Sequence, residues 1–135
     1  MEVLTYLRET IDLKPTDRVA DVGSGTGFLS ELFLSNRNRV IGVEPNVEMR
    51  SAAEAIMADS PEFISQDGAA EATGLVNASV DLVVAGQAFH WFDPVKTKTE
   101  FRRVLKPGGQ VALIWNVCQL DGSQFMQAYE TMLRS

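Results

Sequence analysis

The sequence predicts an α/β fold built on a doubly wound parallel sheet of about five strands with helices on both faces. Short, β-branched and almost continuously apolar segments recur along the chain, as expected of strands that are covered on both faces. Segments with apolar residues at helical spacing lie between them. This alternation favours parallel strands joined by right-handed crossovers, because other connections are very rare.

Five segments have the strand pattern, and those between them have the helix pattern. The predicted strands are 18–22, 39–44, 62–66, 80–86 and 110–116. The predicted helices between them are 28–35, 46–58 and 93–105. Asp93 and Pro94 are a favourable start for the last of these helices, and the KPGG stretch at 106–109 is typical of a stop and turn. In such a Rossmann-like sheet, ligands bind beyond the carboxyl ends of the strands where the winding reverses, here between the first and fourth strands.

The chain length of 135 residues is that of one domain. We expect an amphipathic helix over about 2–12, a core over about 13–116 and a further amphipathic helix over about 122–134.

The composition of the sequence disfavours some classes of binding partner. Apolar residues make up 45% and charged residues 22% of the sequence, which is ordinary for a globular protein. The net charge of −6 disfavours a nucleic acid or an anionic membrane, since both attract clustered cations. Cys118 is the single cysteine, so no intramolecular disulfide forms, and we predict no metal site. No apolar stretch approaches the length of a membrane span, and the start of the sequence lacks a signal-peptide pattern. We therefore expect a cytoplasmic protein with a small-molecule partner.

Three glycines, Gly23, Gly25 and Gly27, follow the first predicted strand and precede a helix. Residues without a Cβ let the backbone turn sharply and let a ligand lie against it, while the helix amides point at that ligand. The spacing is not that of a dinucleotide loop, which needs a glycine where Phe28 or Ser30 stands. The loop is therefore typical of a nucleotide-type ligand other than NAD.

An acidic residue, Glu44, ends the second predicted strand, before Pro45 and a helix start. That strand neighbours the first one in the predicted sheet, so a carboxylate there can accept hydrogen bonds from both hydroxyls of a ribose held by the glycine loop.

The stretch VADVGSGTGFLS, at 19–30, resembles the first motif of the class I S-adenosylmethionine-dependent methyltransferases. The resemblance continues through DGAAEATGL at 67–75, SVDLVVAGQAFHWFDP at 79–94 and EFRRVLKPGGQVALIWN at 100–116. It covers about residues 13–116, and AFHWFDP followed by VLKPGG is typical of the small-molecule, type 11-like branch of that family.

The resemblance implies S-adenosylmethionine as cofactor, S-adenosylhomocysteine as product and in-line methyl transfer to a small-molecule acceptor. The cofactor-binding residues that it implies are Asp21, Gly23, Ser24, Gly25, Gly27, Glu44, Pro45, Ala69, Ala70, Glu71 and Gln87. Ala69 stands where the family often has an Asp that accepts from the adenine amino group. Adenine recognition would then use backbone amides around Ala70, with Asp67 or Glu71 as a substitute acceptor.

Three further residues near the predicted crevice are candidates for chemistry. His90, the single histidine, is the candidate general base if the acceptor must lose a proton; the alternative is that it packs in the loop and caps it. Trp91 is a candidate wall of the adenine or acceptor pocket, or a core residue. Asn116 is a candidate substrate contact, or a strand-end residue in a turn.

The family has seven strands, the last two forming an antiparallel hairpin, and we expect that hairpin to be missing from a truncated chain. The fifth strand would then have an open edge, which another copy or a domain swap would cover. Two other functions remain open: a non-catalytic module that binds S-adenosylmethionine or S-adenosylhomocysteine, and, less favoured, an NAD-binding oxidoreductase.

Overall fold

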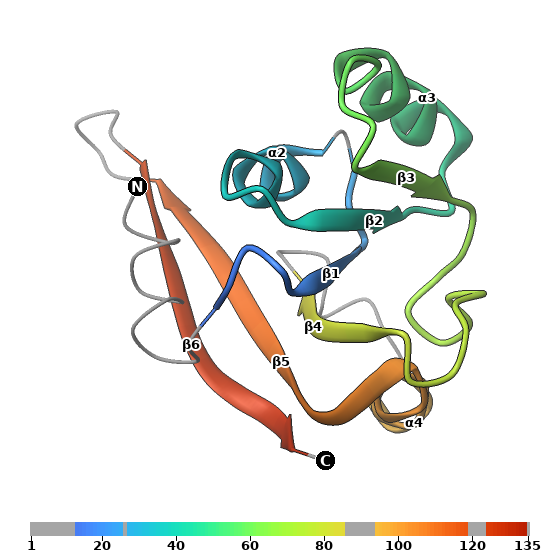
Figure 1. Ribbon diagram of the computed structural model, residues 1–135, viewed down its shortest axis with the longest axis vertical. Coiled ribbons are helices and arrows are strands. Elements are labelled where there is room, and N and C mark those ends of the chain that lie inside the picture. Colours follow the sequence, from blue (N-terminus) through green and yellow to red (C-terminus); the bar gives the residue numbers. More distant parts are fainter. Residues whose placement is uncertain (1–12, 26, 86–93, 119–123, 135) are drawn as a thin grey trace.

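The computed structural model describes residues 13–25, 27–85, 94–118 and 124–134. The strands are β1 (Arg18–Val22), β2 (Arg39–Val43), β3 (Phe63–Gln66), β4 (Val80–Ala85), β5 (Leu105–Cys118) and β6 (Gln124–Arg134). The helices are α2 (Phe28–Ser35), α3 (Val47–Ile56) and α4 (Pro94–Val104). The strands form one sheet in the order β3-β2-β1-β4-β5-β6 (Figure 1). The predicted amino-terminal helix over 2–12 lies outside the described residues.

The first five strands are parallel, as predicted. β1 pairs with both β2 and β4, so the winding reverses between β1 and β4. The carboxyl ends of these strands meet at one edge of the sheet, which makes that edge the expected place for a ligand.

The carboxyl-terminal segment corrects the prediction. Residues Gln124–Arg134 form a sixth strand, antiparallel to β5, where we expected a helix over 122–134. The apolar spacing favours a helix, but pairing along β5 satisfies a row of backbone groups that would otherwise be open, and such tertiary pairing outweighs weak helix propensity. β6 therefore covers the edge of the fifth strand that we expected to be open. We also expected no antiparallel strand after the fifth one, and β6 is such a strand.

β5 also begins earlier than predicted, at Leu105 instead of residue 110. The KPGG stretch at 106–109 is not a separate turn but an irregularity in the strand. The register with β4 shifts between Val80, which faces Leu105, and Leu82, which faces Gln110.

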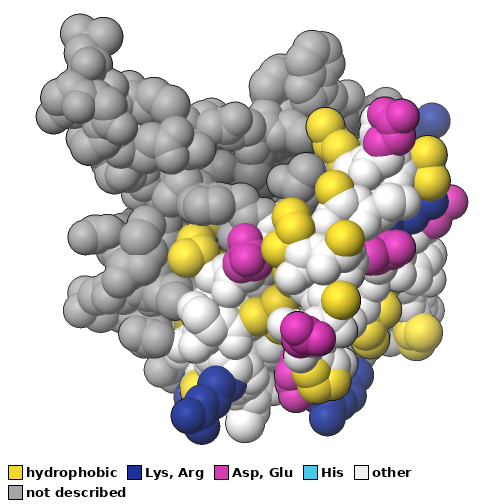
Figure 2. All heavy atoms as spheres, turned by 90° about the horizontal axis from the view of Figure 1, so that it is seen from above, with side chains coloured by type: hydrophobic (Ala, Val, Ile, Leu, Met, Phe, Trp, Pro, Cys, Tyr) yellow, Lys and Arg dark blue, Asp and Glu magenta, His cyan; other side chains and the backbone are white. Residues whose placement is uncertain are grey.

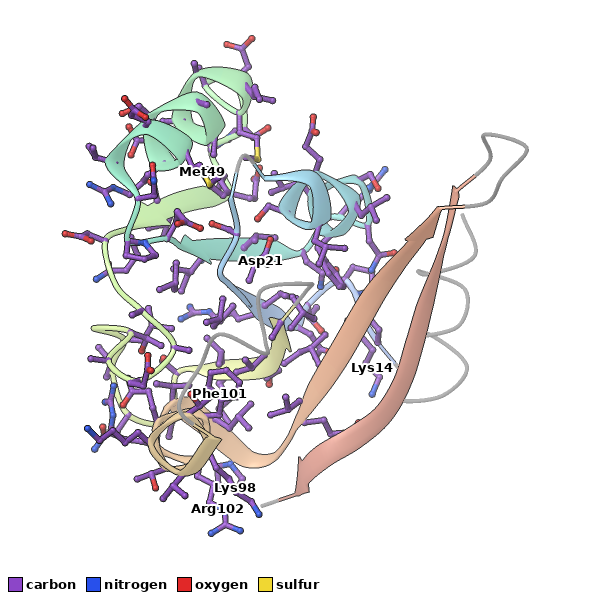
Figure 3. All side chains as sticks on the ribbon, turned by 180° about the vertical axis from the view of Figure 1, so that it is seen from behind. Lys14, Asp21, Met49, Lys98, Phe101 and Arg102 are labelled. Atoms are coloured by element: carbon purple, nitrogen blue, oxygen red, sulfur yellow. The ribbon has the colours of Figure 1, made fainter. Side chains whose placement is uncertain are left out.

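Two apolar clusters lie on opposite faces of the sheet, as the predicted double winding requires. Phe101 and Val104 of α4 pack on one face and Leu29 and Phe33 of α2 on the other. Successive strand residues point to opposite faces, so each central strand contributes to both clusters. In Figure 3, Phe101 points from α4 toward the sheet while Lys98 and Arg102 point away from it.

None of the helices in the described part of the chain has the length and hydrophobicity needed to cross a lipid bilayer.

Candidate functional site

The glycine loop lies at the carboxyl end of β1 and is bonded to the neighbouring strand. The N–H groups of Gly23 and Ser24 donate to the Val43 carbonyl at 2.8 and 3.1 Å. The Gly27 N–H donates to the Ser24 carbonyl at 2.9 Å, which closes the turn. The φ angles of Gly23, Gly25 and Gly27 are 72°, 58° and 99°, so the loop follows a left-handed path. This path brings the loop against the end of β2, where Glu44 begins the next connection.

Gly27 is the N-cap of α2 and has no side-chain cap. A Cβ at this position would clash with the Met57 methyl group and lie close to Ala53 of α3. The absence of a Cβ at Gly27 therefore allows two things: a left-handed turn, and the close approach of α3 to the start of α2.

Asp21 is buried in β1, with 1% of its surface exposed, and it faces α2 (Figure 3). The Ser30 hydroxyl donates to its Oδ2 at 2.8 Å. Burial raises the pKa of Asp21 to about 6; hydrogen bonds from the Ser30 side chain and backbone oppose this rise, and the nearby charge of Glu44 adds to it. Asp21 therefore fixes the start of α2 and places negative charge beneath the loop.

Glu44 joins the end of β2 to the glycine loop. Its Oε1 accepts from the Gly25 N–H at 2.8 Å and its Oε2 from the Asn46 N–H at 3.1 Å. The residue is 8% exposed. A carboxylate has about four acceptor positions, and the described residues use two of them. The loop and Glu44 thus form one unit, as the strand order predicts, and the adjoining Pro45 is exposed.

The described part of the chain leaves open space beside Gly25. A Cβ there would meet, among the described residues, only the Met49 sulfur at 4.0 Å. A ligand can therefore approach the bare backbone of the loop next to the Glu44 carboxylate.

The segment after β3 is folded back on itself. The N–H of Ala69 donates to the Ala72 carbonyl, and the N–H of Ala72 donates to the Ala69 carbonyl, at 3.1 and 3.0 Å. Ala70 is buried in the core and Glu71 is half-buried. Asp67 forms an ion pair with Arg50 at 3.3 Å. One carboxylate oxygen of Asp67 therefore already has a partner in Arg50.

Gln87, His90 and Trp91 lie outside the described residues. Asn116 lies within β5 opposite Met126 of β6, so its backbone is in a strand and not in a turn.

The structure adds residues that the sequence pattern did not single out: Ser30, Arg50, Thr73 and Glu100. Arg50 Nη1 donates to the Glu44 carbonyl at 2.8 Å as well as pairing with Asp67. The Glu100 carboxylate of α4 accepts from the Thr73 N–H and hydroxyl. The only signal in the sequence is the spacing of Glu100 and Arg103, three residues apart on a predicted helix, which indicates an ion pair but not its contact with Thr73.

Comparison with known proteins gives concordant results. Residues 20–113 match the family model described as methyltransferase domain. An uncharacterized methyltransferase of Mycobacterium tuberculosis is 39% identical over 115 residues, covering 83% of this chain and 46% of the relative. An uncharacterized methyltransferase of Schizosaccharomyces pombe is 34% identical over 117 residues, covering 86% of this chain and 45% of the relative. The chain therefore spans a little under half the length of these curated relatives.

Solved structures have the same fold. The YcgJ protein from Bacillus subtilis superposes with a TM-score of 0.74 at 28% identity, covering 89% of this chain and 53% of that one. A protein described as a SAM-dependent methyltransferase from Aquifex aeolicus superposes with a TM-score of 0.76 at 24% identity, covering 85% of this chain and 62% of that one. At this identity the second likeness supports the fold alone.

Proposed function

Because the chain belongs to the methyltransferase domain family, we propose that it binds S-adenosylmethionine at the carboxyl ends of β1, β2 and β3 and methylates a small molecule. The observation that carries the proposal is the bond of 2.8 Å from the Gly25 N–H to the Glu44 carboxylate, which joins the bare glycine loop to an acidic group with acceptor capacity left over.

The described residues fit this cofactor. Two ribose hydroxyls need acceptors, and Glu44 has two acceptor positions beyond those used by Gly25 and Asn46. A sulfonium and an ammonium group favour nearby negative charge, which Asp21 and Glu44 supply. Among the described residues, none would keep such a ligand from the Gly25 backbone on the side of its Cβ position.

When bound, S-adenosylmethionine supplies a methyl group on a sulfonium centre, which is already activated for displacement. The chain's own task is then to orient the reactants, and such positioning contributes up to roughly 7–11 kcal/mol in favourable cases. Glu44 would hold the ribose side, and the backbone of 68–71 would line the adenine side. We propose His90 as the base where the acceptor carries a proton, and Trp91, Gln87 and Asn116 as residues around the acceptor and cofactor.

A second candidate is a module that binds the cofactor without turnover. It would use the same cofactor site, so binding alone does not separate it from an enzyme, and methyl transfer does. An NAD-linked oxidoreductase stays the least favoured reading, since the glycine spacing does not fit a dinucleotide loop.

Isothermal titration calorimetry with S-adenosylhomocysteine and with NAD tests the proposal. We expect the first to bind and the second not to bind. Methyl transfer from labelled S-adenosylmethionine to a pooled small-metabolite extract then separates an enzyme from a binding module. Binding of NAD in place of S-adenosylhomocysteine would contradict the proposal.

The Glu44→Ala variant tests the ribose assignment. Loss of two charge-assisted hydrogen bonds should weaken S-adenosylhomocysteine binding by about 100-fold or more. Glu62→Ala is the matched control, because Glu62 is an exposed carboxylate before β3, at the opposite edge of the sheet. The unfolding temperature of each variant reports any separate effect of losing the Gly25 contact. Unchanged binding by Glu44→Ala would remove the ribose assignment.

We further propose a cytoplasmic protein that does not bind nucleic acid. The single cysteine is compatible with a reducing compartment. On the described part of the face shown in Figure 2, acidic and basic side chains are interspersed with apolar ones instead of forming one basic patch. Self-association through an open fifth strand is no longer supported, because β6 pairs along β5.

A further inference from the structure

We propose that Glu100 of α4 is a positioning residue for the adenine side of the cofactor site. It acts through Thr73, which sets the backbone of the segment Gly68–Leu75. This inference rests on the cofactor binding proposed above, and it assigns a role in that binding to a helix far from the glycine loop in the sequence.

The contact between Glu100 and Thr73 is short and buried. Glu100 Oε2 accepts from the Thr73 N–H at 2.8 Å and from the Thr73 hydroxyl at 2.6 Å. The Thr73 hydroxyl also accepts from the Leu75 N–H at 3.2 Å. Thr73 is fully buried and Glu100 is 8% exposed. Charge-assisted hydrogen bonds are strong where water is excluded, so this contact fixes the backbone at 73–75.

The Glu100 carboxylate is itself held in one orientation. Arg103 donates to both of its oxygens, through Nε at 2.9 Å and Nη2 at 2.6 Å. Arg103 Nη1 also donates to the Asn77 side chain at 2.6 Å. These bonds from Arg103, with those from Thr73, lower the pKa of Glu100 to about 2 against the opposing effect of burial. The carboxylate therefore stays ionised across the physiological pH range and does not act as a switch.

The position of Thr73 determines that of the residues proposed to face adenine. A Cβ at Gly68 would lie 2.5 Å from the Thr73 carbonyl oxygen, so the backbone at 68 rests directly on Thr73. The reciprocal bonds between Ala69 and Ala72 continue this contact. A shift of Thr73 must therefore move the backbone at 68–69.

The other end of the segment is held from α3. Arg50 pairs with Asp67 at 3.3 Å and donates to the Glu44 carbonyl at 2.8 Å. The segment is thus linked to the Glu44 backbone through Asp67, the residue before its start, and to α4 through Thr73 near its end. Loss of the Glu100 contact should move the adenine side while leaving the ribose side in place.

The test compares Thr73→Val and Glu100→Gln with two further variants. Thr73→Ser retains both donors to Glu100 and should behave as the parent protein does. Thr97→Val is the matched control, since Thr97 is also buried on α4 and its hydroxyl has no hydrogen-bond partner among the described residues. Calorimetry measures the Kd of each variant for S-adenosylhomocysteine and for S-inosylhomocysteine, in which an oxo group replaces the adenine amino group.

We expect Thr73→Val and Glu100→Gln to bind S-adenosylhomocysteine about tenfold more weakly than the parent and to lose most of its preference for adenine over the oxo analogue. Amide hydrogen exchange should become faster at 69–75 in these variants and stay unchanged in β1 and β2. A role in stability alone would lower the unfolding temperature without changing the ratio of the two Kd values.

The outcomes separate this inference from the proposed function. If the parent binds S-adenosylhomocysteine and both variants keep its Kd and its preference, the inference is wrong and the proposed function stands. If the parent binds neither analogue, the proposed function is wrong and the inference is wrong with it.

Discussion

Asp21 shows how one buried carboxylate links the site to the stability of the protein. Its folded-state pKa of about 6 exceeds the unfolded value of 3.8, chiefly because burial disfavours the charged form. The folded state therefore binds a proton more tightly than the unfolded state, and the free energy of unfolding falls as pH rises between these values. A shift of this size corresponds to about 3 kcal/mol at neutral pH, as an upper bound.

We predict that Asp21→Asn is more stable than the parent at pH 8, by about 1–3 kcal/mol, because an amide avoids the cost of a buried charge. The advantage should shrink as the pH falls from 6 toward 4, where Asp21 is protonated. Urea unfolding at a series of pH values measures both effects. A constant difference across that range would contradict the prediction.

The Ser30→Ala variant removes the other partner of the Asp21–Ser30 hydrogen bond and serves as a comparison for Asp21→Asn. The Ser30 hydroxyl lowers the folded-state pKa of Asp21, so its removal should extend the fall in stability to higher pH and make the total loss larger. The two variants therefore change the same pH profile in opposite ways, which a general loss of packing does not do.

The sequence predicted the contacts of some site residues and not those of others. The strand order alone brings Glu44 to the glycine loop, because the ends of neighbouring parallel strands meet, and the structure has this contact. The ion pair of Asp67 with Arg50 joins a loop to a helix face, and the contact of Thr73 with Glu100 joins residues 27 positions apart. No local pattern encodes such contacts, since they depend on how the elements pack.

At the scale of elements, the predicted boundaries are best where local chemistry and packing agree. The predicted helix over 28–35 matches α2. Its N-cap Gly27 turns the chain and, having no Cβ, leaves room for α3 to pack closely. The strand predicted over 110–116 is instead Leu105–Cys118, because pairing with β4 continues through the KPGG stretch. Turn residues predict a change of direction but not whether a neighbouring strand continues its pairing across it.

We predict that Gly27→Ala destabilises the protein by about 2–4 kcal/mol, through a positive φ of 99° and a clash of the new methyl group with Met57. Gly108→Ala is the matched control, since Gly108 has a φ of 83° but no described atom within 4 Å of its Cβ position. It should cost about 1–2 kcal/mol from the backbone alone.

Urea unfolding measures both costs. A double-mutant cycle of Gly27→Ala with Met57→Ala should show a favourable coupling, because the truncated side chain leaves room for the methyl group. Equal costs for the two glycine variants would mean that α3 does not constrain the start of α2.

At the scale of the whole molecule, the sheet is one strand larger than the sequence predicted, and the extra strand runs against the others. β6 follows β5 as its antiparallel partner, and the two form the long arm of the sheet seen in Figure 1. The apolar positions of 124–134 are compatible with a helix by spacing, so local pattern could not exclude it. The strand forms instead of a helix because the 14-residue β5 offers it a row of unpaired backbone N–H and C=O groups. This row exists only once the rest of the sheet has formed.

Two neighbouring proline variants, Gln127→Pro and Ala128→Pro, distinguish the strand from the helix. Residues 127 and 128 pair with Trp115 and Ile114 in a regular part of the ladder. In an antiparallel edge strand, successive N–H groups point alternately to the partner strand and to solvent. One variant should therefore lose a ladder hydrogen bond and about 1–3 kcal/mol, while the other is tolerated. In a helix, both would cost about 3 kcal/mol, since each proline would lie in the interior. Urea unfolding of the two variants decides between these results, and equal destabilisation by both would exclude the paired strand.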